Sequence, residues 1–537
     1  MKVRPDLIFL GVAVLAIAFL PDQAQAQTPQ KTFVYCSEGS PSSFNPQVAS
    51  DGTTFNASSH TVYNRLIEFK QGSTEIESKL ALSWAISKDG LKYTFKLRPR
   101  VQFHSNDIFK PSRDFNADDV IYSFQVQKDA KNPLRLPTAN YEYFVGMEMD
   151  KIIAQVKKIN DLTVEFTLTR PEAPFLANLA MDFASILSKE YAETLLKQKK
   201  DLQLISTKPI GTGPFVFKSY QKDTLIRYTA NANYFDGVPK IQNLVFAITP
   251  DPSVRLQKLK AGECHFVADP APSDLDTIAK NKNLKLMEKE GLNIGYLAIN
   301  TSKKPFDNVK VRQAIHHALN RQQYITAVFL GHGVVAKNPI PPIMWSYNNK
   351  VVDYEFNPSK AKALLKEAGY ANGFETELWT MPVSRAYNPA GKKMGELMQS
   401  DLAAVGIKVK LATYDWPTYL EKARKGEHQL IQIGWTGDNG DPDNFLHILL
   451  GCAAVESGSN YARWCYKPYN DLVVQAKQLT NQGQRSELYQ KAQVIFKQQA
   501  PWVTLVHGQF YRAMSSKVTG YAIHPFGGDI FDKVDLK

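Results

Sequence analysis

Hydrophobic and polar residues alternate with two different periods between residues 292 and 436. Short runs at 292–300, 374–383, 407–414 and 429–436 are apolar or alternate with a period of two, which is typical of β-strands. The segments that separate the last three runs have apolar residues at helical spacing. Strands and helices in this order predict a parallel sheet that is covered by helices.

Several predicted helices carry recognisable end signals. In the first half of the chain, Asn116 precedes a helical segment and is a candidate N-cap residue. Asn357 and Gly369 bracket a second helix in the same way, and Asn388 and Gly406 bracket a third. These residues set the expected helix boundaries.

The ends of two predicted strands bring an arginine and an aspartate to one edge of the sheet. Arg385 lies in "SRAY", directly after one strand, and Asp438 lies in "GWTGDNGDPDNF", directly after another. Ligands of open parallel sheets bind beyond the carboxyl ends of the strands. Arg385 and Asp438 are therefore predicted to face the same crevice.

The loop around Asp438 contains further acids and glycines. Gly437 and Gly440 would let the backbone approach a ligand closely. We expect Asp441 and Asp443 to be turn and capping residues. Among the acids of this loop, only Asp438 is therefore expected to meet a ligand.

Composition adds a targeting segment to a globular chain. The 537 residues are 44% hydrophobic and 22% charged, enough for two or three lobes. "MKVRPD" is a basic start, "LIFLGVAVLAIAFL" an apolar run too short to span a bilayer, and "AQA" a small-residue cleavage site. Residues 1–26 are therefore predicted to be a signal peptide, cut near Ala26, on an exported and soluble protein. No cysteine directly follows the apolar run, so no lipid anchor is expected.

An even number of cysteines in an exported chain favours disulfide bonds. Three pairings of the four cysteines are possible in principle. Cys452 and Cys465 would close a small loop that contains a "GSN" turn, and this leaves Cys36 and Cys264 for a long-range link. A four-cysteine zinc site is the rival interpretation, but the chain has no CxxC pair.

Charge and known motifs exclude several classes of function. The net charge is +12, but the basic residues are scattered among acids and predict a solvated surface rather than a nucleic-acid site. The loop at Asp438 lacks the spacing of a calcium loop, and His316 and His317 point apart on a helix. The chain has no complete dinucleotide-binding fingerprint, no phosphate-binding P-loop motif and no GxSxG motif of serine hydrolases. We predict no metal, no cofactor and no catalytic residue.

Longer motifs resemble a known family. "LALSWAISKDGLKYTFKLRPRVQFH" and "PFDNVKVRQAIHHALNR" are similar to signatures of the peptide- and nickel-binding solute receptors of bacterial ABC importers. "KTFVYCSEGSPSSFNPQ", "RPEAPFLANLAMDFASILSKEYA" and "GWTGDNGDPDNF" resemble the dipeptide-binding branch of that family. The resemblance extends over the chain after the signal peptide.

The resemblance implies an α/β fold of two lobes that close on a ligand like a hinged trap. Lobe I would comprise residues 27–289 and 509–537, with an extra subdomain inserted at about 63–210. Lobe II would comprise residues 290–508, with the crossings near Glu290 and Gly508.

The resemblance also implies roles for individual residues. The amine of a bound peptide would meet Asp438 and its carboxylate would meet Arg385, and both charges would then be paired when closure removes water. A turn that reads "SDGT" stands where the family has "TSGT", and Trp435 is expected in the wall of the site. The full set of predicted ligand-binding residues is Ser50, Gly52, Tyr141, Arg385, Ala386, Tyr387, Trp435, Thr436, Gly437 and Asp438.

These features predict a periplasmic receptor, without enzymatic activity, that delivers dipeptides to an inner-membrane ABC permease. The protein would act as a monomer, without nucleic acid, and a chemoreceptor is a possible second partner. Within the same receptor class, haem, 5-aminolevulinate or a cell-wall peptide are alternative ligands. A secreted hydrolase is the alternative from another class, because a pair of catalytic carboxylates is not excluded by counting acids.

Overall fold

One large sheet organises the protein in a computed structural model that describes residues 1, 30–137 and 139–537. Its strands follow the order β16-β15-β17-β13-β18-β11-β1-β10-β9-β8, and β12 and β14 also pair with β18. Residues 31–537 form a compact unit. Except for Met1, the predicted signal peptide lies outside the described residues.

The first half of the sheet, which we call the first lobe, surrounds β1. This strand pairs in parallel with both β10 and β11. The strands of this half are β1 (Thr32–Ser37), β8 (Phe215–Gln221), β9 (Leu225–Ala230), β10 (Asn243–Ile248), β11 (Phe266–Ala268) and β12 (Leu284–Glu290). Its helices are α8 (Pro252–Ala261), η3 (Pro272–Asp274) and α9 (Leu275–Lys280).

A second, four-stranded sheet is formed within residues 81–168, inside the predicted insertion of the first lobe. Its strands have the order β4-β5-β7-β6 and are antiparallel. They are β4 (Ala81–Ile86), β5 (Lys92–Leu97), β6 (Ile153–Asn160) and β7 (Thr163–Leu168). The helices around them are α2 (Ala117–Lys128), α3 (Glu142–Gly146), α4 (Met149–Ile152), α5 (Phe175–Leu179), η2 (Asp182–Ala184), α6 (Lys189–Lys197) and α7 (Leu204–Thr207). The smaller elements are η1 (Pro46–Val48), α1 (Gly52–Ala57), β2 (Ile67–Phe69), β3 (Ile76–Ser78), β19 (Val518–Thr519) and β20 (Asp535–Leu536).

The other half of the large sheet, which we call the second lobe, has the predicted alternation of strands and helices. β15 pairs in parallel with both β16 and β17, so the predicted parallel pairing is confirmed for these three strands. β13, by contrast, is antiparallel to both of its neighbours, β17 and β18, so the sheet of this lobe is mixed. The strands are β13 (Asn293–Ile299), β14 (Gly333–Val335), β15 (Phe374–Trp379), β16 (Ile407–Ala412) and β17 (Leu430–Thr436). The helices are α10 (Val309–Ala318), α11 (Arg321–Phe329), α12 (Pro358–Glu367), α13 (Gly391–Ala403), α14 (Trp416–Arg424), α15 (Asp443–Leu446), α16 (Ala453–Ser457), α17 (Lys467–Gln478) and α18 (Gln482–Gln499).

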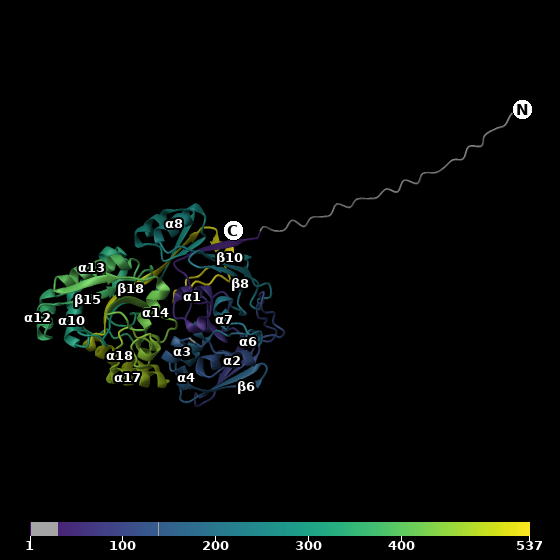
Figure 1. Cartoon of the computed structure of the whole chain (residues 1–537), viewed down its shortest axis with the longest axis horizontal. Helices are drawn as coiled ribbons and strands as arrows, with labels where there is room; N and C mark the ends of the chain where they lie inside the picture. Colours follow the sequence, from purple (N-terminus) through teal and green to yellow (C-terminus); the bar gives the residue numbers. More distant parts are fainter. Residues whose placement is uncertain (2–29, 138) are drawn as a thin grey trace. The chain divides into compact units, whose positions relative to one another are not determined.

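One long strand, β18 (Trp502–Ser515), belongs to both lobes (Figure 1). Its first part pairs with β13 in the second lobe, and its last part, from Gln509 onward, pairs with β12 in the first lobe. β12 ends at Glu290, and only two residues separate it from the start of β13. Two neighbouring stretches of chain thus connect the lobes, although the lobe boundaries along the chain stay a prediction.

The capping residues show where local sequence determines the helices. Asn116 caps α2 and forms a capping box with Asp119, and the side chain of Asn357 caps α12. Asn388 does not cap α13, so that prediction was wrong. Its backbone instead pairs with that of Arg385 in a tight turn, and its side chain donates a hydrogen bond to Gln432. The side chain of a polar residue before a helix can thus form a hydrogen bond to a residue of the sheet instead of capping the helix.

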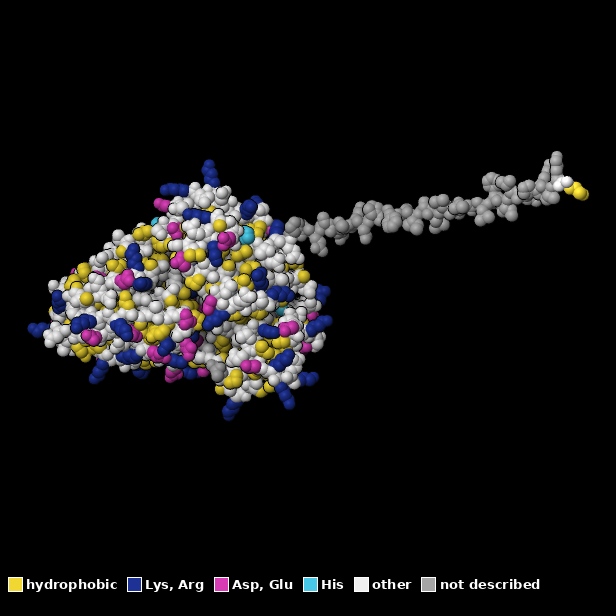
Figure 2. All heavy atoms as spheres, turned by 45° about the horizontal axis from the view of Figure 1, so that its top comes forward, with side chains coloured by type: hydrophobic (Ala, Val, Ile, Leu, Met, Phe, Trp, Pro, Cys, Tyr) yellow, Lys and Arg dark blue, Asp and Glu magenta, His cyan; other side chains and the backbone are white. Residues whose placement is uncertain are grey.

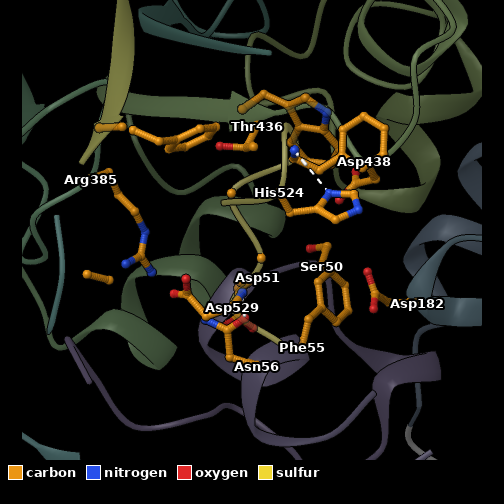
Figure 3. Close-up of a pocket in the computed structure, with 18 of the residues that line it drawn as sticks. Ser50, Asp51, Phe55, Asn56, Asp182, Arg385, Thr436, Asp438, His524 and Asp529 are labelled. Carbon is orange, nitrogen blue, oxygen red and sulfur yellow. Dashed lines mark hydrogen bonds between the residues drawn. The ribbon is translucent and has the colours of Figure 1, made fainter. Parts of the chain in front are cut away.

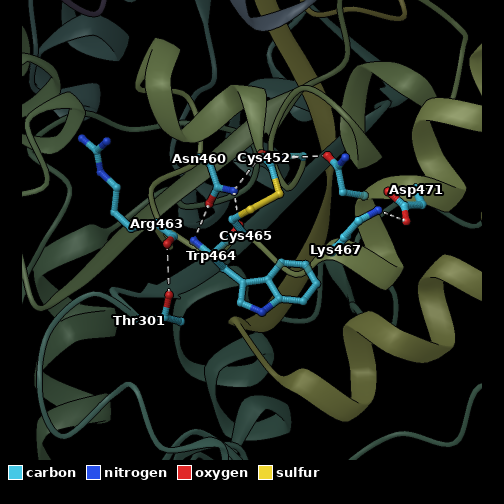
Figure 4. The surroundings of a disulfide bond; sticks show 10 residues. Thr301, Cys452, Asn460, Arg463, Trp464, Cys465, Lys467 and Asp471 are labelled. Atoms are coloured by element: carbon cyan, nitrogen blue, oxygen red, sulfur yellow. Dashed lines mark hydrogen bonds and ion pairs between the residues drawn. A yellow bond between two sulfur atoms is a disulfide. The ribbon is translucent and has the colours of Figure 1, made fainter.

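Both predicted disulfide bonds are present. Cys36 of β1 is bonded to Cys264, and this bond links segments 228 residues apart. Cys452 and Cys465, 13 residues apart, close the predicted small loop (Figure 4). Inside this loop Asn460 donates hydrogen bonds to the carbonyl groups of Gly451 and Trp464, so the loop is internally ordered.

The surface agrees with the prediction of a solvated basic protein. On the face shown in Figure 2, Lys and Arg side chains are spread over the surface with Asp and Glu among them. Within the described part of the chain, we find no helix that is both long and apolar enough to cross a bilayer.

Candidate functional site

A cavity of the described structure lies where the two lobes meet. Its lining comes from α1 and the segment 524–530 of the first lobe and from the ends of β15 and β17 in the second. The cavity volume is about 140 Å³, counted as the space open to the centres of water molecules. This space suits a ligand of on the order of ten non-hydrogen atoms, about the size of ten waters.

Asp438 lies two residues beyond β17, at one side of this cavity (Figure 3). Its carboxylate accepts a hydrogen bond of 2.5 Å from the hydroxyl group of Tyr143, and its backbone N–H donates to Asn444. Among the described residues it has no ion-pair partner. Burial raises the pKa of Asp438 to about 8, and the negative charge of Asp182 adds to this rise. A cation placed beside this group would stabilise its ionised form.

Arg385 lies at the other side of the cavity, six residues beyond β15 (Figure 3). Its Nη1 donates to Glu38 at 2.7 Å, and its guanidinium group lies over the ring of Trp416 at 5.4 Å. Burial alone would lower the pKa of Arg385, but Glu38 and weaker contributions from other nearby acidic groups together outweigh burial and keep the pKa above its ordinary value. Nη2 is buried without a hydrogen-bond partner in the described structure. One nitrogen is therefore left for an anionic ligand.

Most of the other predicted ligand-binding residues also line the cavity. Those that do are Ser50, Gly52, Ala386, Tyr387, Trp435 and Thr436. Trp435 forms part of the wall, and its indole N–H donates to the same Asn444 side chain that binds the backbone of Asp438. A single asparagine thus fixes both the ring and the loop beside it.

Two of the predicted ligand-binding residues, Tyr141 and Gly437, do not line the cavity. Tyr141 is 1% exposed and lies beneath Arg135, whose guanidinium carbon is 4.3 Å from the ring centre. Tyr143, two residues further along, lines the cavity in its place. Gly437 donates its N–H to the carbonyl of Leu292, and a Cβ there would approach the ring of Phe445 to 2.7 Å. Packing within the second lobe therefore accounts for this glycine.

The two later acids of the Asp438 loop have structural partners. Asp441 forms an ion pair of 2.7 Å with Arg485, and its carboxylate also accepts the N–H of Asp443 in a turn. Asp443 begins α15 without a side-chain cap, and burial raises the pKa of its carboxyl group to about 8. Asp441 therefore shapes the turn with its side chain, as expected. Asp443 takes part in the turn through its backbone N–H, and its side chain does not cap α15.

Sequence reasoning missed several residues of the cavity. Glu38, the partner of Arg385, lies in a stretch that gives no sign of its long-range contact. Asp182 contacts His60 Nε2 at 3.0 Å and Arg65 Nη1 at 3.2 Å, and all three line the cavity. Each belongs to the first lobe, where no strand pattern points to the site. In the described ranges, we find no group of three His, Cys, Asp or Glu residues placed to hold a metal ion.

Comparison with known proteins shows similarity over nearly the whole chain. Residues 75–457 match the family model of the bacterial extracellular solute-binding proteins, family 5 Middle. The dipeptide-binding protein of Escherichia coli is 51% identical over 532 residues, which are 98% of each chain. Heme-binding protein A of Haemophilus influenzae is 47% identical, and the match covers 100% of both chains.

A solved structure gives a similar result. The dipeptide-binding protein of Pseudoalteromonas sp. SM9913, crystallised in complex with Met-Leu, superposes with a TM-score of 0.92 at 40% identity. The match covers 94% of this chain and 100% of that chain. The two-lobed fold is thereby established.

Proposed function

This chain belongs to family 5 of the bacterial extracellular solute-binding proteins, and we propose from that premise that it captures dipeptides in the cavity between its lobes. The observation that carries the proposal is the pair of opposite charges at the two sides of one small cavity. Asp438 is without a cation in the described structure, and Arg385 has a nitrogen without a partner. A dipeptide zwitterion supplies the missing charge at each side.

The physical argument concerns the removal of water on closure. Each charged terminus of a peptide loses its hydration when the lobes close, and this cost is offset only when each charge meets a partner. Because the two partners are fixed to the ends of neighbouring strands, they also fix the length of the ligand. We therefore propose that dipeptides bind in preference to single amino acids and to long peptides.

The cellular role follows from this proposal. The receptor would act in the periplasm after removal of residues 1–26 and deliver its ligand, as a monomer, to the permease of an ABC importer. A chemoreceptor would be a second partner for the closed form. The relatives are solute-binding proteins, so we propose binding without catalysis.

Calorimetry with Ala-Ala and with N-acetyl-Ala-Ala tests the proposal. Acetylation removes the ammonium group that Asp438 is proposed to bind, and we expect the affinity to fall more than tenfold. Equal affinity for the two ligands would refute the role of Asp438. Free alanine in the mixture after incubation would instead support a hydrolase.

Haem is a second candidate because one relative is named for binding it. A cavity of about 140 Å³ is far smaller than a porphyrin requires, which favours the dipeptide. Titration with haem and with 5-aminolevulinate, each in competition with Ala-Ala, distinguishes these ligands.

A further inference from the structure

The cavity is lined by acids that a dipeptide's own ammonium group does not neutralise. Among the described residues, the lining carboxylates are Glu38, Asp51, Asp182, Asp269, Asp438 and Asp529. The lining guanidinium groups are those of Arg65, Arg385 and Arg512. The question is which carboxylate lacks a cation once the termini of a peptide are in place.

Most of these carboxylates already contact a cationic side chain, although two of them share the same arginine. Arg512 forms ion pairs of 2.7 Å with both Asp269 and Asp529. Asp182 has Arg65 and His60, as described above, and Glu38 has Arg385. Asp438 would receive the ammonium group of the ligand. Asp51 remains.

Asp51 is held by hydrogen-bond donors instead of cations. It is the N-cap of α1, and its carboxylate accepts from the N–H of Thr54 at 3.0 Å, from the hydroxyl of Ser42 at 2.9 Å and from the hydroxyl of Thr53. It is 5% exposed, lines the cavity and has no ion pair in the described structure. Its charge acts on Arg385, so it lies within electrostatic range of the proposed ligand site.

A second observation concerns Asp529, which Figure 3 shows, like Asp51, on the side of the pocket opposite Thr436. Arg512 and Tyr521 both donate to Oδ1 of Asp529. Its Oδ2 is buried and has no hydrogen-bond partner in the described part of the chain. Buried polar atoms are normally paired, so an unpaired carboxylate oxygen in a cavity wall points to a ligand donor.

We propose that Asp51, assisted by Asp529, makes this cavity select dipeptides with a cationic side chain over dipeptides with an acidic one. The inference rests on the proposed function and specifies its substrate class. A zwitterionic backbone adds no net charge, so the side chain alone decides whether the negative charge of Asp51 is compensated or reinforced. In a site that excludes water this difference is only weakly screened.

The test is calorimetry at low salt with Ala-Ala, Ala-Lys, Lys-Ala, Ala-Glu and Glu-Ala. At one position or both, we expect the lysine peptide to bind at least tenfold more tightly than the glutamate peptide. If Ala-Ala binds but lysine and glutamate peptides bind equally at both positions, the inference fails and the proposed function stands. If none of the five peptides binds, the proposed function itself fails.

A pair of matched variants tests the role of Asp51. Asp51→Asn keeps an oxygen that can cap α1 and removes the charge, and we expect it to reduce the lysine-to-glutamate affinity ratio at least threefold. Asp251→Asn is the control, because Asp251 caps α8 in the same way and does not line the cavity. An unchanged ratio in Asp51→Asn, or an equal change in both variants, would overturn the inference.

Discussion

At the scale of single residues, Asp438 carries a charge that closure of the lobes makes costly. Its pKa is about 8 in this structure, in which Tyr143 of the other lobe contacts the carboxyl group, against an ordinary value of 3.8, because burial disfavours the carboxylate. In an open form the group would be solvated and ionised at neutral pH. Closing an empty cavity then requires protonation of Asp438, whereas closing on an ammonium group does not. The ligand's amine would thereby drive closure.

This difference predicts that acid closes the ligand-free protein. The pKa of this carboxyl group is higher in the closed form than in the open form, so closure requires the group to take up a proton. The free-energy cost of closure therefore rises as the pH increases from the open-state pKa to the closed-state pKa. Lowering the pH from 8 to 5 should therefore increase the closed fraction, which fluorescence transfer between labels on the two lobes would measure. Asp438→Asn should lose much of this pH dependence. An identical pH profile in the variant would contradict the argument.

Arg385 uses one nitrogen for the protein and has another for a ligand, which a lysine cannot do. Nη1 is bonded to Glu38, and Nη2 is unpaired. Arg385→Lys should therefore weaken dipeptide binding more than tenfold by calorimetry, and Arg385→Ala at least as much. For a dipeptide amide, which lacks the carboxylate, the wild type and Arg385→Lys should bind alike. A further loss with the amide would show that the lysine disturbs the site in another way.

The sequence was sufficient to predict that Asp438 and Arg385 lie at one cavity, but it did not reveal the residues that surround them there. Both follow strands of one parallel sheet, and such strands place their ends on a common edge. Glu38 and Asp182 reach the cavity from the first lobe through contacts between distant segments, which no local pattern records. Tyr141 and Tyr143 show the remaining problem, because the turn of a short helix decides which of two tyrosines faces the cavity.

At the scale of elements, the pattern of strands was predictable and the helix ends were only partly so. β15, β16 and β17 were predicted because their apolar runs are separated by helices with clear periodicity. Asn357 caps its helix, but Asn388 does not, since a tight turn with Arg385 competes for its backbone. Such competition depends on the neighbouring strand, which local sequence does not contain.

The Cys452–Cys465 bond should stabilise the second lobe measurably. It closes a loop of 13 residues, and cross-links of that length contribute about 3 kcal/mol by restricting the unfolded chain. We expect the double variant Cys452→Ser/Cys465→Ser to lose about that much free energy of unfolding in guanidinium titrations. The other disulfide remains intact in this variant and serves as an internal control. A loss below about 0.5 kcal/mol would mean that the loop is held by its hydrogen bonds alone.

At the scale of the whole molecule, a second set of charges joins the lobes away from the ligand cavity. Lys477 of α17 is completely buried and forms ion pairs with Glu148 at 3.1 Å and with Glu172 at 3.7 Å, both in the predicted insertion of the first lobe. The backbone N–H of Ala173 also donates to the carbonyl of Lys477. Burial raises the pKa of Glu172 to about 7 although Lys477 opposes the rise. This group therefore adds to the acid-induced closure expected for Asp438.

Lys477 contacts neither Asp438 nor Arg385. Its removal should therefore change the closing of the lobes without changing which dipeptides bind best. Lys477→Met would leave two carboxylates buried without their main cation in the closed form only, and breaking a buried ion pair is strongly unfavourable. We expect all dipeptides to dissociate at least tenfold faster in stopped-flow measurements, with their order of affinity preserved. Lys467→Met is the matched control, since Lys467 lies on the same helix in an exposed ion pair of 2.6 Å with Asp471, and exposed pairs contribute little. Equal dissociation rates in the two variants would mean that Lys477 stabilises the fold rather than the closed state.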